Sequence, residues 1–330
     1  MSESIVSIRN LATHYPITGG WFGPTPVVRA LDNIDLEIKR GQFFGLVGES
    51  GSGKTTLGRA ILKAAPISAG KIIFHDGKKE FDINTLAKRD VLAFRRQAQL
   101  IFQDPYAALS PRMTVRDIIA EPLEVMKLTS SKDETNQRVR EIASECRLNV
   151  EHLRRFPHAF SGGQRQRISI ARALVANPSF MVADESVAAL DVSIQADILN
   201  LLKSLQQQRG LTFLFISHDL SVVAHVCDVV AVIYLGRLVE MAPTRKLFAK
   251  QRHPYTAALL SAIPSLDLDH HHKAIKLEGE IPSSIAPPSG CRFHTRCAYA
   301  QDRCKMEIPQ WRKLDDDHSV ACHFADELDL

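Results

Sequence analysis

The sequence predicts an α/β protein with a mainly parallel β-sheet. Short apolar runs typical of buried strands alternate with segments whose apolar residues recur at helical spacing. A glycine-rich loop joins one such run to a helix, and two acidic residues directly follow another run. Strands that alternate with helices build parallel sheets, and ligands bind such sheets at the carboxyl ends of the strands. We therefore expect the functional residues to lie in the loops that follow strands.

The glycine-rich loop is the strongest signal in the sequence. Residues 48–55 fit the pattern G-x-x-x-x-G-K-T, with the apolar run Phe43–Val47 before it and a predicted helix, Thr55–Ala64, after it. In this context the pattern is a P-loop, whose backbone N–H groups cradle phosphates. Lys54 is expected to reach the β- and γ-phosphates and Thr55 to ligate Mg²⁺. The predicted nucleotide-binding residues of the loop are Gly48, Glu49, Ser50, Gly51, Ser52, Gly53, Lys54, Thr55 and Thr56.

The segments around this loop fit the same fold class. Residues 5–11 and 31–38 alternate apolar and polar residues, which predicts two half-buried strands with a turn-rich loop at 19–24 between them, and Tyr15 just after the first. Residues 114–153 are mostly helical in pattern, and Pro122 predicts a break. The remaining predicted strands are 71–74, 99–103, 180–183, 212–216 and a hairpin of 229–234 with 237–240; the remaining helices are 161–176, 194–206 and 253–263.

Two acidic residues carry the second chemical signal. Asp184 and Glu185 follow the buried strand Phe180–Ala183. A carboxylate at the end of such a strand can hold Mg²⁺, as the Walker-B Asp does. The adjacent carboxylate can accept a proton from an attacking water. We therefore expect Asp184 to be a Mg²⁺ ligand and Glu185 a general base.

Composition limits the classes of function. The 330 residues carry a net charge of +4, from 41 basic and 37 acidic residues, which is too small to indicate a nucleic-acid partner. We see no signal peptide, and the run Val229–Leu235 is far too short to span a bilayer. We expect the chain to be soluble and cytoplasmic, with any membrane role exerted through a partner.

In their order along the chain, these motifs resemble those of an ABC-transporter ATPase subunit. The resemblance covers residues 5 to about 245 and rests on residues 48–55, Gln103, Ser161–Gln164, Asp184–Glu185, Ala189–Asp191 and His218. Within that superfamily the chain resembles the oligopeptide/dipeptide-importer ATPases, through residues 102–106, 110–115, 190–196, 253–256 and the Cys-rich tail. Residues 104–106, Asp-Pro-Tyr, look like the second of the two ATPase types in these importers, which implies a different ATPase as partner.

The resemblance implies a role for each matching residue. Tyr15 resembles the aromatic residue that stacks on adenine, although a packed strand-end tyrosine would look the same. Gln103 resembles the residue that touches Mg²⁺ or water and senses the γ-phosphate. His218 resembles the switch histidine, and Asp191 the residue that reaches across the dimer. Ser161, Gly162, Gly163 and Gln164 form the signature, which in this family grips ATP bound to the other subunit.

Two positions depart from the family pattern. The residue after the catalytic glutamate is usually Pro and is Ser186 here. The residue before Ala189–Leu190–Asp191 is usually Ser and is Ala188 here. Neither change removes a phosphate- or metal-binding group.

The resemblance also implies an architecture and partners. We expect a RecA-like P-loop NTPase core, with an antiparallel β part, in residues 1–103 and 161–250, a helical subdomain inserted at 104–160, and a small Cys-rich C-terminal extension at 251–330. The expected partners are a second ABC ATPase subunit, two transmembrane permease subunits and, indirectly, a solute-binding protein, at the cytoplasmic face of the bacterial inner membrane. Importers of nickel, oligosaccharides or opines are alternatives to peptide importers. A more distant alternative is a soluble ABC ATPase acting on DNA or ribosomes, but such proteins usually carry a coiled-coil insertion or a second cassette, and neither is seen in this sequence. Another is a P-loop metabolic kinase, against which the signature counts.

The last part of the chain raises a separate question. Cys291, Cys297, Cys304 and Cys322 are separated by five, six and seventeen residues, whereas Cys146 and Cys227 read as buried apolar residues. Clustered cysteines in a cytosolic protein favour a metal over disulfides. A 4Fe–4S cluster, which some ATPases of this family carry on this tail, zinc, and packed thiols remain open, with His294, His318 and His323 as alternative ligands. The run His270–His272 reads as part of a solvated linker, 267–273.

Overall fold

The computed structural model describes residues 3–17, 26–263 and 275–330, in two compact units that are considered separately below. Unit 1 comprises Met1–Ile5, Lys39–Phe43 and Phe74–Ile216; unit 2 comprises Val6–Ile38, Phe44–Ile73 and Ser217–Leu330. The predicted loop at 19–24 and the predicted polar linker at 267–273 lie outside the described residues.

Unit 1 contains three parallel strands, β6 (Ala98–Ile101), β7 (Phe180–Asp184) and β8 (Thr212–Ile216). Ala98 lies opposite Phe180, and Phe180 opposite Thr212. Every residue of β7 and β8 is buried, which is why both read as continuous apolar runs. The predicted parallel arrangement is confirmed here.

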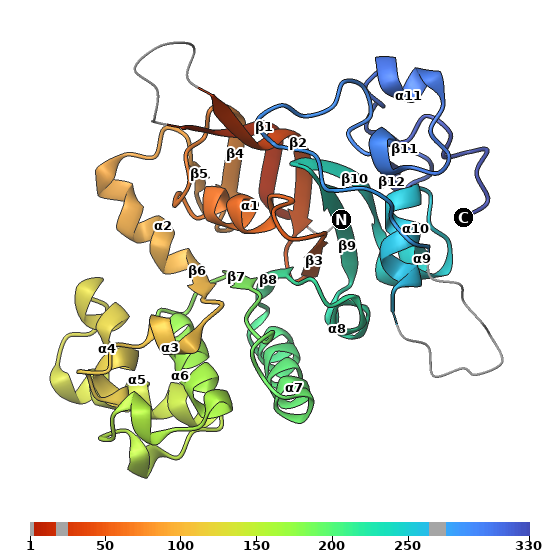
Figure 1. Ribbon diagram of the computed structural model, residues 1–330. Helices are drawn as coiled ribbons and strands as arrows, with labels where there is room; N and C mark the ends of the chain where they lie inside the picture. The colour runs from red at the N-terminus through yellow and green to blue at the C-terminus, as the bar shows by residue number, and fades with distance from the viewer. Residues whose placement is uncertain (1–2, 18–25, 264–274) are drawn as a thin grey trace. The chain divides into compact units, whose positions relative to one another are not determined.

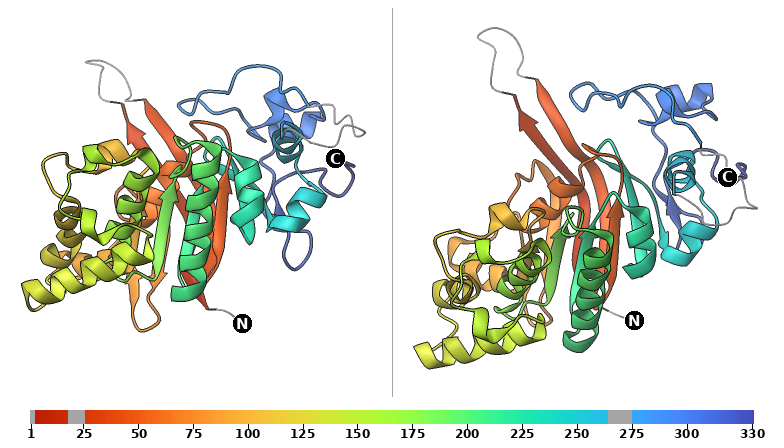
Figure 2. Two further views of the ribbon diagram at one scale, coloured as in Figure 1. Left: turned by 90° about the horizontal axis from the view of Figure 1, so that it is seen from below. Right: turned by 60° about the horizontal axis from the view of Figure 1, so that its bottom comes forward.

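Helices make up most of the rest of unit 1. In Figure 1, α3, α4, α5 and α6 gather into one group, and both views of Figure 2 show the long helix α7 running beside β7. The α-helices are α2 (Val91–Gln97), α3 (Pro105–Ala108), α4 (Val115–Val125), α5 (Lys132–Glu145), α6 (Gly162–Leu174) and α7 (Val192–Arg209). The short elements are β5 (Glu80–Asp82) and the 3₁₀ turns η1 (Lys88–Asp90), η2 (Val150–His152) and η3 (Pro157–Ala159).

Side-chain capping explains where α4 and α5 begin. The helix break predicted at Pro122 is wrong. Thr114 and Ser131 cap α4 and α5 by accepting hydrogen bonds from backbone N–H groups of the first turn. Pro122 lies inside α4, and the break comes after Met126. Ile118, Ile119 and Leu123, buried around it, offset the cost of the lost backbone hydrogen bond.

Aromatic side chains form much of the core of unit 1. Phe43 stacks on Phe213 with ring centroids 4.8 Å apart. Phe74 meets Phe94 edge-on at 5.4 Å and Phe180 at 6.1 Å. These contacts tie the short segment 39–43 to β8 and the start of β7 to α2.

Unit 2 combines a parallel pair with antiparallel strands. The strand β3 (Phe43–Val47) runs parallel to β9 (Val229–Tyr234), so that Phe44 faces Val229. The strand β9 forms a hairpin with β10 (Arg237–Pro243), whose other edge pairs with β12 (Ser319–Val320) and, through it, with β11 (Arg312–Lys313). A second sheet contains β2 (Val27–Lys39), β1 (Ser4–Pro16) and β4 (Ala69–His75) in that order. The antiparallel hairpin predicted for 229–234 and 237–240 is confirmed.

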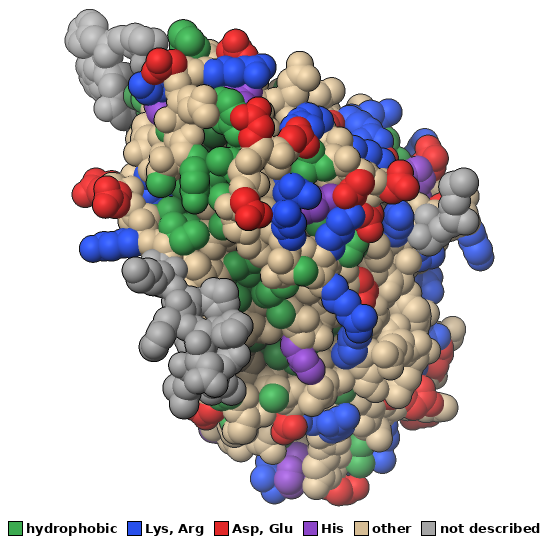
Figure 3. All heavy atoms as spheres, turned by 90° about the vertical axis from the view of Figure 1, so that its right-hand side faces the viewer, with side chains coloured by type: hydrophobic (Ala, Val, Ile, Leu, Met, Phe, Trp, Pro, Cys, Tyr) green, Lys and Arg blue, Asp and Glu red, His purple; other side chains and the backbone are tan. Residues whose placement is uncertain are grey.

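Residues 251–330, predicted to form a C-terminal extension, belong to unit 2. Their strand β12 extends the sheet of unit 2. Acidic and basic side chains are interspersed on the face that carries the extension (Figure 3). The helices are α1 (Lys54–Ile61), α8 (Leu220–Val226), α9 (Thr244–Ala249), α10 (Pro254–Ser261), the 3₁₀ turn η4 (His294–Arg296) and α11 (Asp302–Met306).

Among the described helices, none combines the length and the apolar composition needed to cross a membrane.

Candidate nucleotide site

The phosphate-binding loop of unit 2 has the backbone that its glycines predict. Gly48 and Gly53 adopt positive φ angles of 156° and 108°. A Cβ atom at Gly48 would lie 2.2 Å from the carbonyl oxygen of Ile233, and one at Gly53 would lie 2.6 Å from that of Ala30. Only glycine fits this close approach, so the loop curls tightly against β9 and β2.

The polar groups of this loop suit an anionic ligand. Helix α1 begins at Lys54, so its N-terminal end opens onto the loop, with Thr55 and Thr56 half-buried in the first turn. The Lys54 Nζ donates to the carbonyl oxygens of Gly48 at 2.7 Å and Glu49 at 2.9 Å. The Ser52 hydroxyl is buried without a hydrogen-bond partner in the described structure. A buried cation, a helix N-terminus and an orphaned hydroxyl are the donor set that a phosphate requires.

Two further predicted residues belong to unit 2. His218 is exposed directly after Ser217, whose N–H donates to the carbonyl oxygen of Leu46 at 3.3 Å. Because Leu46 lies two residues before Gly48, His218 lies next to the strand that leads into the loop. Tyr15 is half-buried inside β1, rather than after it as predicted, because the strand extends to Pro16.

Unit 1 holds the predicted hydrolytic residues. Asp184 ends β7 and is only 6% exposed, whereas Glu185 is half-buried. Glu185 has a φ angle of 45°, in the left-handed region that non-glycine residues rarely occupy, and its N–H donates to Ile216 O at 2.9 Å. Its carboxylate accepts a hydrogen bond of 2.9 Å from the Gln103 side-chain amide. Backbone strain of this kind clusters at functional sites.

Ser186, the residue after Glu185, buries a polar group that lacks a hydrogen-bond partner in the described structure. The Ser186 side chain is 2% exposed, and its hydroxyl has no hydrogen-bond partner in the described structure. A proline at this position, as in the family pattern, would leave no such group. Ala188, the second departure, is exposed.

The signature forms the N-terminus of α6. Ser161 and Gln164 make a capping box, in which each side chain bonds the backbone of the other residue. A Cβ atom at Gly163 would lie 2.4 Å from the Ile194 side chain, and one at Gly162 would lie 3.6 Å from Leu190. The segment around Asp191, which is itself exposed, therefore packs on the signature.

The four cysteines of the tail line one small cavity of about 20 Å³ in unit 2. His294 and His323 also line it, whereas His318 pairs instead with the buried Glu240 at 2.7 Å. Burial, with repulsion from the neighbouring thiols, raises the pKa of Cys291 to about 12 and that of Cys322 to about 11. No group of three or more His, Cys, Asp or Glu in the described part of the chain is arranged to hold a metal ion. Cys146 and Cys227 are buried, as predicted.

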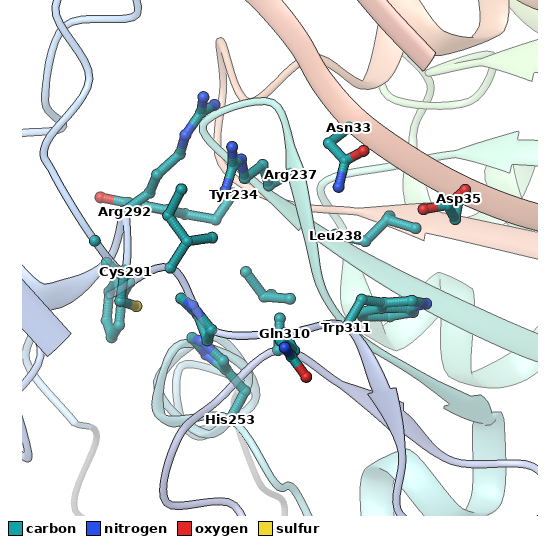
Figure 4. A pocket seen from close by; sticks show the side chains of 16 residues that line it. Asn33, Asp35, Tyr234, Arg237, Leu238, His253, Cys291, Arg292, Gln310 and Trp311 are labelled. Atoms are coloured by element: carbon teal, nitrogen blue, oxygen red, sulfur yellow. The ribbon is translucent and has the colours of Figure 1, made fainter. Parts of the chain in front are cut away.

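A larger cavity of about 450 Å³ lies beside these cysteines (Figure 4). In Figure 4, side chains of β2, β9, β10, the N-cap of α10 and the tail surround it. Its two arginines, Arg237 and Arg292, both bond Asp32. Burial raises the pKa of Asp32, but the arginines outweigh it, so that the pKa lies below its usual range. Asp32 thus offsets part of the positive charge of this wall.

Two residues that the sequence did not single out for the site contact the phosphate-binding loop. The Tyr255 hydroxyl accepts a hydrogen bond from the Glu49 N–H, and Arg296 binds the Glu49 carboxylate. Tyr255 falls within a motif typical of the family tail, but nothing in its spacing connects it with the loop. Arg296 lies between two cysteines and carries no signal of its own.

The fold and the site together define an ATP-binding cassette ATPase. Solved structures support this class. A dimeric ATP-binding cassette, MJ0796, in a post-hydrolysis state with ADP and Pi, matches with a TM-score of 0.63 and 28% identity over 73% of this chain and 99% of its own. CbiO1 of Clostridium perfringens, part of an ABC transporter complex, matches with a TM-score of 0.64 and 27% identity over 75% of this chain and 91% of its own.

The sequence comparisons show to which family of ATP-binding cassette ATPases the chain belongs. The family profile described as ABC transporter matches residues 31–188, and the one described as oligopeptide/dipeptide transporter, C-terminal region, matches residues 239–304. The chain is 50% identical to a Brucella ovis protein named "Putative peptide import ATP-binding protein", over 98% of both chains. It is 43% identical to the di/tripeptide transport ATP-binding protein DppF of Pseudomonas aeruginosa, over 99% of both. The chain belongs to the oligopeptide/dipeptide ABC importer ATPase family, and it is an ATPase that uses ATP and Mg²⁺.

Proposed function

We propose that this chain hydrolyses ATP to drive the import of dipeptides and oligopeptides. It would act at the cytoplasmic face of the bacterial inner membrane as one of two different ATPase subunits, bound to two permease subunits that receive solute from a separate binding protein. The support is the match to the oligopeptide/dipeptide C-terminal region and the peptide-transport names of relatives that align with the whole chain.

The observation that carries the hydrolytic mechanism is the hydrogen bond between Gln103 and Glu185. This hydrogen bond holds the Glu185 carboxylate in one orientation at the end of β7, where the backbone of Glu185 is strained. Glu185 would take a proton from the attacking water, and Gln103 would hold Glu185 in place and sense the γ-phosphate. Lys54 and His218 would bind the γ-phosphate, and Tyr15 would stack on adenine.

Mg²⁺ would neutralise charge that develops on the phosphates, and Thr55, Gln103 and Asp184 are its proposed ligands. These residues supply oxygen donors, which Mg²⁺ prefers. The signature, Ser161–Gln164, and Asp191 would complete the site of the opposing ATPase subunit.

The proposed functional division assigns nucleotide binding to 1–103 and 161–250, contact with the permeases to the loop after Gln103 and the helical part 104–160, and an accessory role to 251–330. This proposal divides the chain by function, whereas the two compact units are defined by contacts within the fold.

Reconstituted transport tests the proposal. With the second ATPase, the permeases and the binding protein in proteoliposomes, ATP should drive uptake of a labelled tripeptide. Lys54→Ala should abolish it, because the loop loses its buried cation. Arg59→Ala, an exposed basic residue on the same helix, should leave uptake unchanged. Uptake of nickel, an oligosaccharide or an opine in place of the peptide would contradict the substrate class.

The cysteines of the tail support a second proposal, that they hold a 4Fe–4S cluster or a zinc ion. The supporting observation is that all four thiols line a single cavity although they come from separate segments. A cluster or zinc would draw its thiolate ligands from Cys291, Cys297, Cys304 and Cys322 and fix a segment with little regular structure.

Metal analysis of the anaerobically purified chain tests this second proposal. A cluster should give about four irons and four sulfides per chain, and zinc about one ion. Cys304→Ser should lose the metal, whereas Cys146→Ala, at a buried cysteine of unit 1, should retain it. Wild-type protein with neither metal, made in iron- and zinc-replete cells, would leave only packed thiols.

A further inference from the structure

Every polar group of Glu49, the first residue after Gly48 in the phosphate-binding loop, is engaged. Its carbonyl oxygen accepts from Lys54 Nζ at 2.9 Å and from the Ser52 N–H at 3.2 Å. Its N–H donates to the Tyr255 hydroxyl at 2.8 Å. Its carboxylate accepts two hydrogen bonds from Arg296, of 2.7 and 3.0 Å. Glu49 thus joins Lys54 on one side to the C-terminal extension on the other.

The contact with Arg296 is sheltered rather than superficial. The side chains of Arg296 and Glu49 are 6% and 24% exposed. The Glu49 carboxylate, with a smaller contribution from Tyr234, raises the pKa of Arg296 against the effect of burial. A two-bond arginine–carboxylate pair is directional and stronger than a hydrogen bond between neutral groups. Removing one partner would leave the other charge partly buried and unpaired.

The two tail residues are themselves held in place. Tyr234, Tyr255 and Phe293 form an aromatic cluster with ring centroids 4.7 to 5.3 Å apart. Phe293 directly precedes the 3₁₀ turn that ends at Arg296, and the Arg296 N–H donates to the Phe293 carbonyl oxygen at 3.0 Å. Figure 4 shows Tyr234 and Arg292 on the wall of the neighbouring cavity. Arg292 anchors the same segment through the Leu235 carbonyl oxygen and Asp32.

We propose that Arg296 and Tyr255 are positioning residues for ATP binding, which act on the loop through Glu49. Tyr255 fixes the Gly48–Glu49 peptide through its N–H, and the Gly48 carbonyl oxygen of the same peptide accepts a hydrogen bond of 2.7 Å from the Lys54 ammonium. Arg296 neutralises a carboxylate that would otherwise repel the phosphates of ATP. The proposal rests on the proposed role of Lys54 and assigns part of the ATP site to the C-terminal extension.

The test measures equilibrium binding of MgATP to the full-length chain. Arg296→Gln and Tyr255→Phe should each raise the Kd for MgATP about tenfold. A loss of affinity of this size is expected when one hydrogen bond that fixes the loop or involves a charged group is removed. In the assembled complex they should raise KM more than they lower kcat. The double variant Glu49→Gln/Arg296→Gln should recover most of the affinity lost in Arg296→Gln, because the repelling carboxylate is gone.

Matched variants separate this role from a merely structural one. Arg312→Gln removes an exposed ion pair with Asp326 elsewhere in the extension and should leave the Kd unchanged. Tyr255→Phe keeps the aromatic packing, so it tests the hydroxyl even if Arg296→Gln fails to fold. A Kd within twofold of wild type for folded Tyr255→Phe and Arg296→Gln, with binding lost in Lys54→Ala, would overturn this inference alone. Unchanged binding in Lys54→Ala would overturn the proposed role of the loop and this inference with it.

Discussion

Glu185→Gln is expected to slow ATP hydrolysis by the assembled complex at least ~100-fold while leaving the affinity for MgATP near that of wild type. The glutamine side chain has the same size and keeps an oxygen that can accept the hydrogen bond from Gln103. It cannot take a proton from the attacking water. The contacts of the phosphate-binding loop are unchanged, so the loss falls on the chemical step.

Steady-state phosphate release and equilibrium MgATP binding, measured on the same preparation, check this result. Glu80→Gln is the matched control, because Glu80 is an exposed glutamate of unit 1 outside the segment proposed to contact the permeases, and its carboxylate lies 3.1 Å from the His75 ring. It should retain full activity. A Glu185→Gln complex that keeps more than half of the wild-type rate would rule out Glu185 as the base.

Segments with unambiguous periodicity were predictable from the sequence. The apolar runs of β3 and β8 coincide with the observed strands because every residue of both is buried. The phosphate-binding loop was predictable for a related reason: its glycines are dictated by local backbone geometry at Gly48 and Gly53. The signature helix begins where its capping box predicts.

Tertiary packing decided the features that the sequence left open or misplaced. Pro122 reads as a helix break, but buried neighbours keep it inside α4. The Arg296 pair with Glu49 joins residues 247 positions apart, and no local pattern encodes such a contact. The same holds for Gly163, whose lack of a side chain is explained only by Ile194 lying against it. Local rules thus locate the chemical groups, and distant contacts set their orientation.

The signature should act on the opposing subunit, and Gly162 is the position at which this can be tested without disturbing the fold. A Cβ atom there meets Leu190 at 3.6 Å, an ordinary contact, whereas one at Gly163 would overlap Ile194. Gly162→Asp places a carboxylate at the N-terminus of α6, where the helix otherwise offers N–H groups to an anion. We expect it to lower ATP hydrolysis by the assembled complex at least ~100-fold, because the added charge repels the γ-phosphate bound to the partner.

Gly162→Asn is the matched control, since it has the same size without the charge, and it should cost far less activity than Gly162→Asp. Both variants should bind MgATP normally as dilute single chains, because the proposed role of the signature is at the loop of the opposing subunit. For the same reason the dilute wild-type chain should be a poor ATPase that gains activity when the second ATPase and the permeases are added. Equal specific activity of the dilute chain and the complex would contradict a site completed by the opposing subunit. Equal losses in the Asp and Asn variants would contradict charge repulsion at the signature.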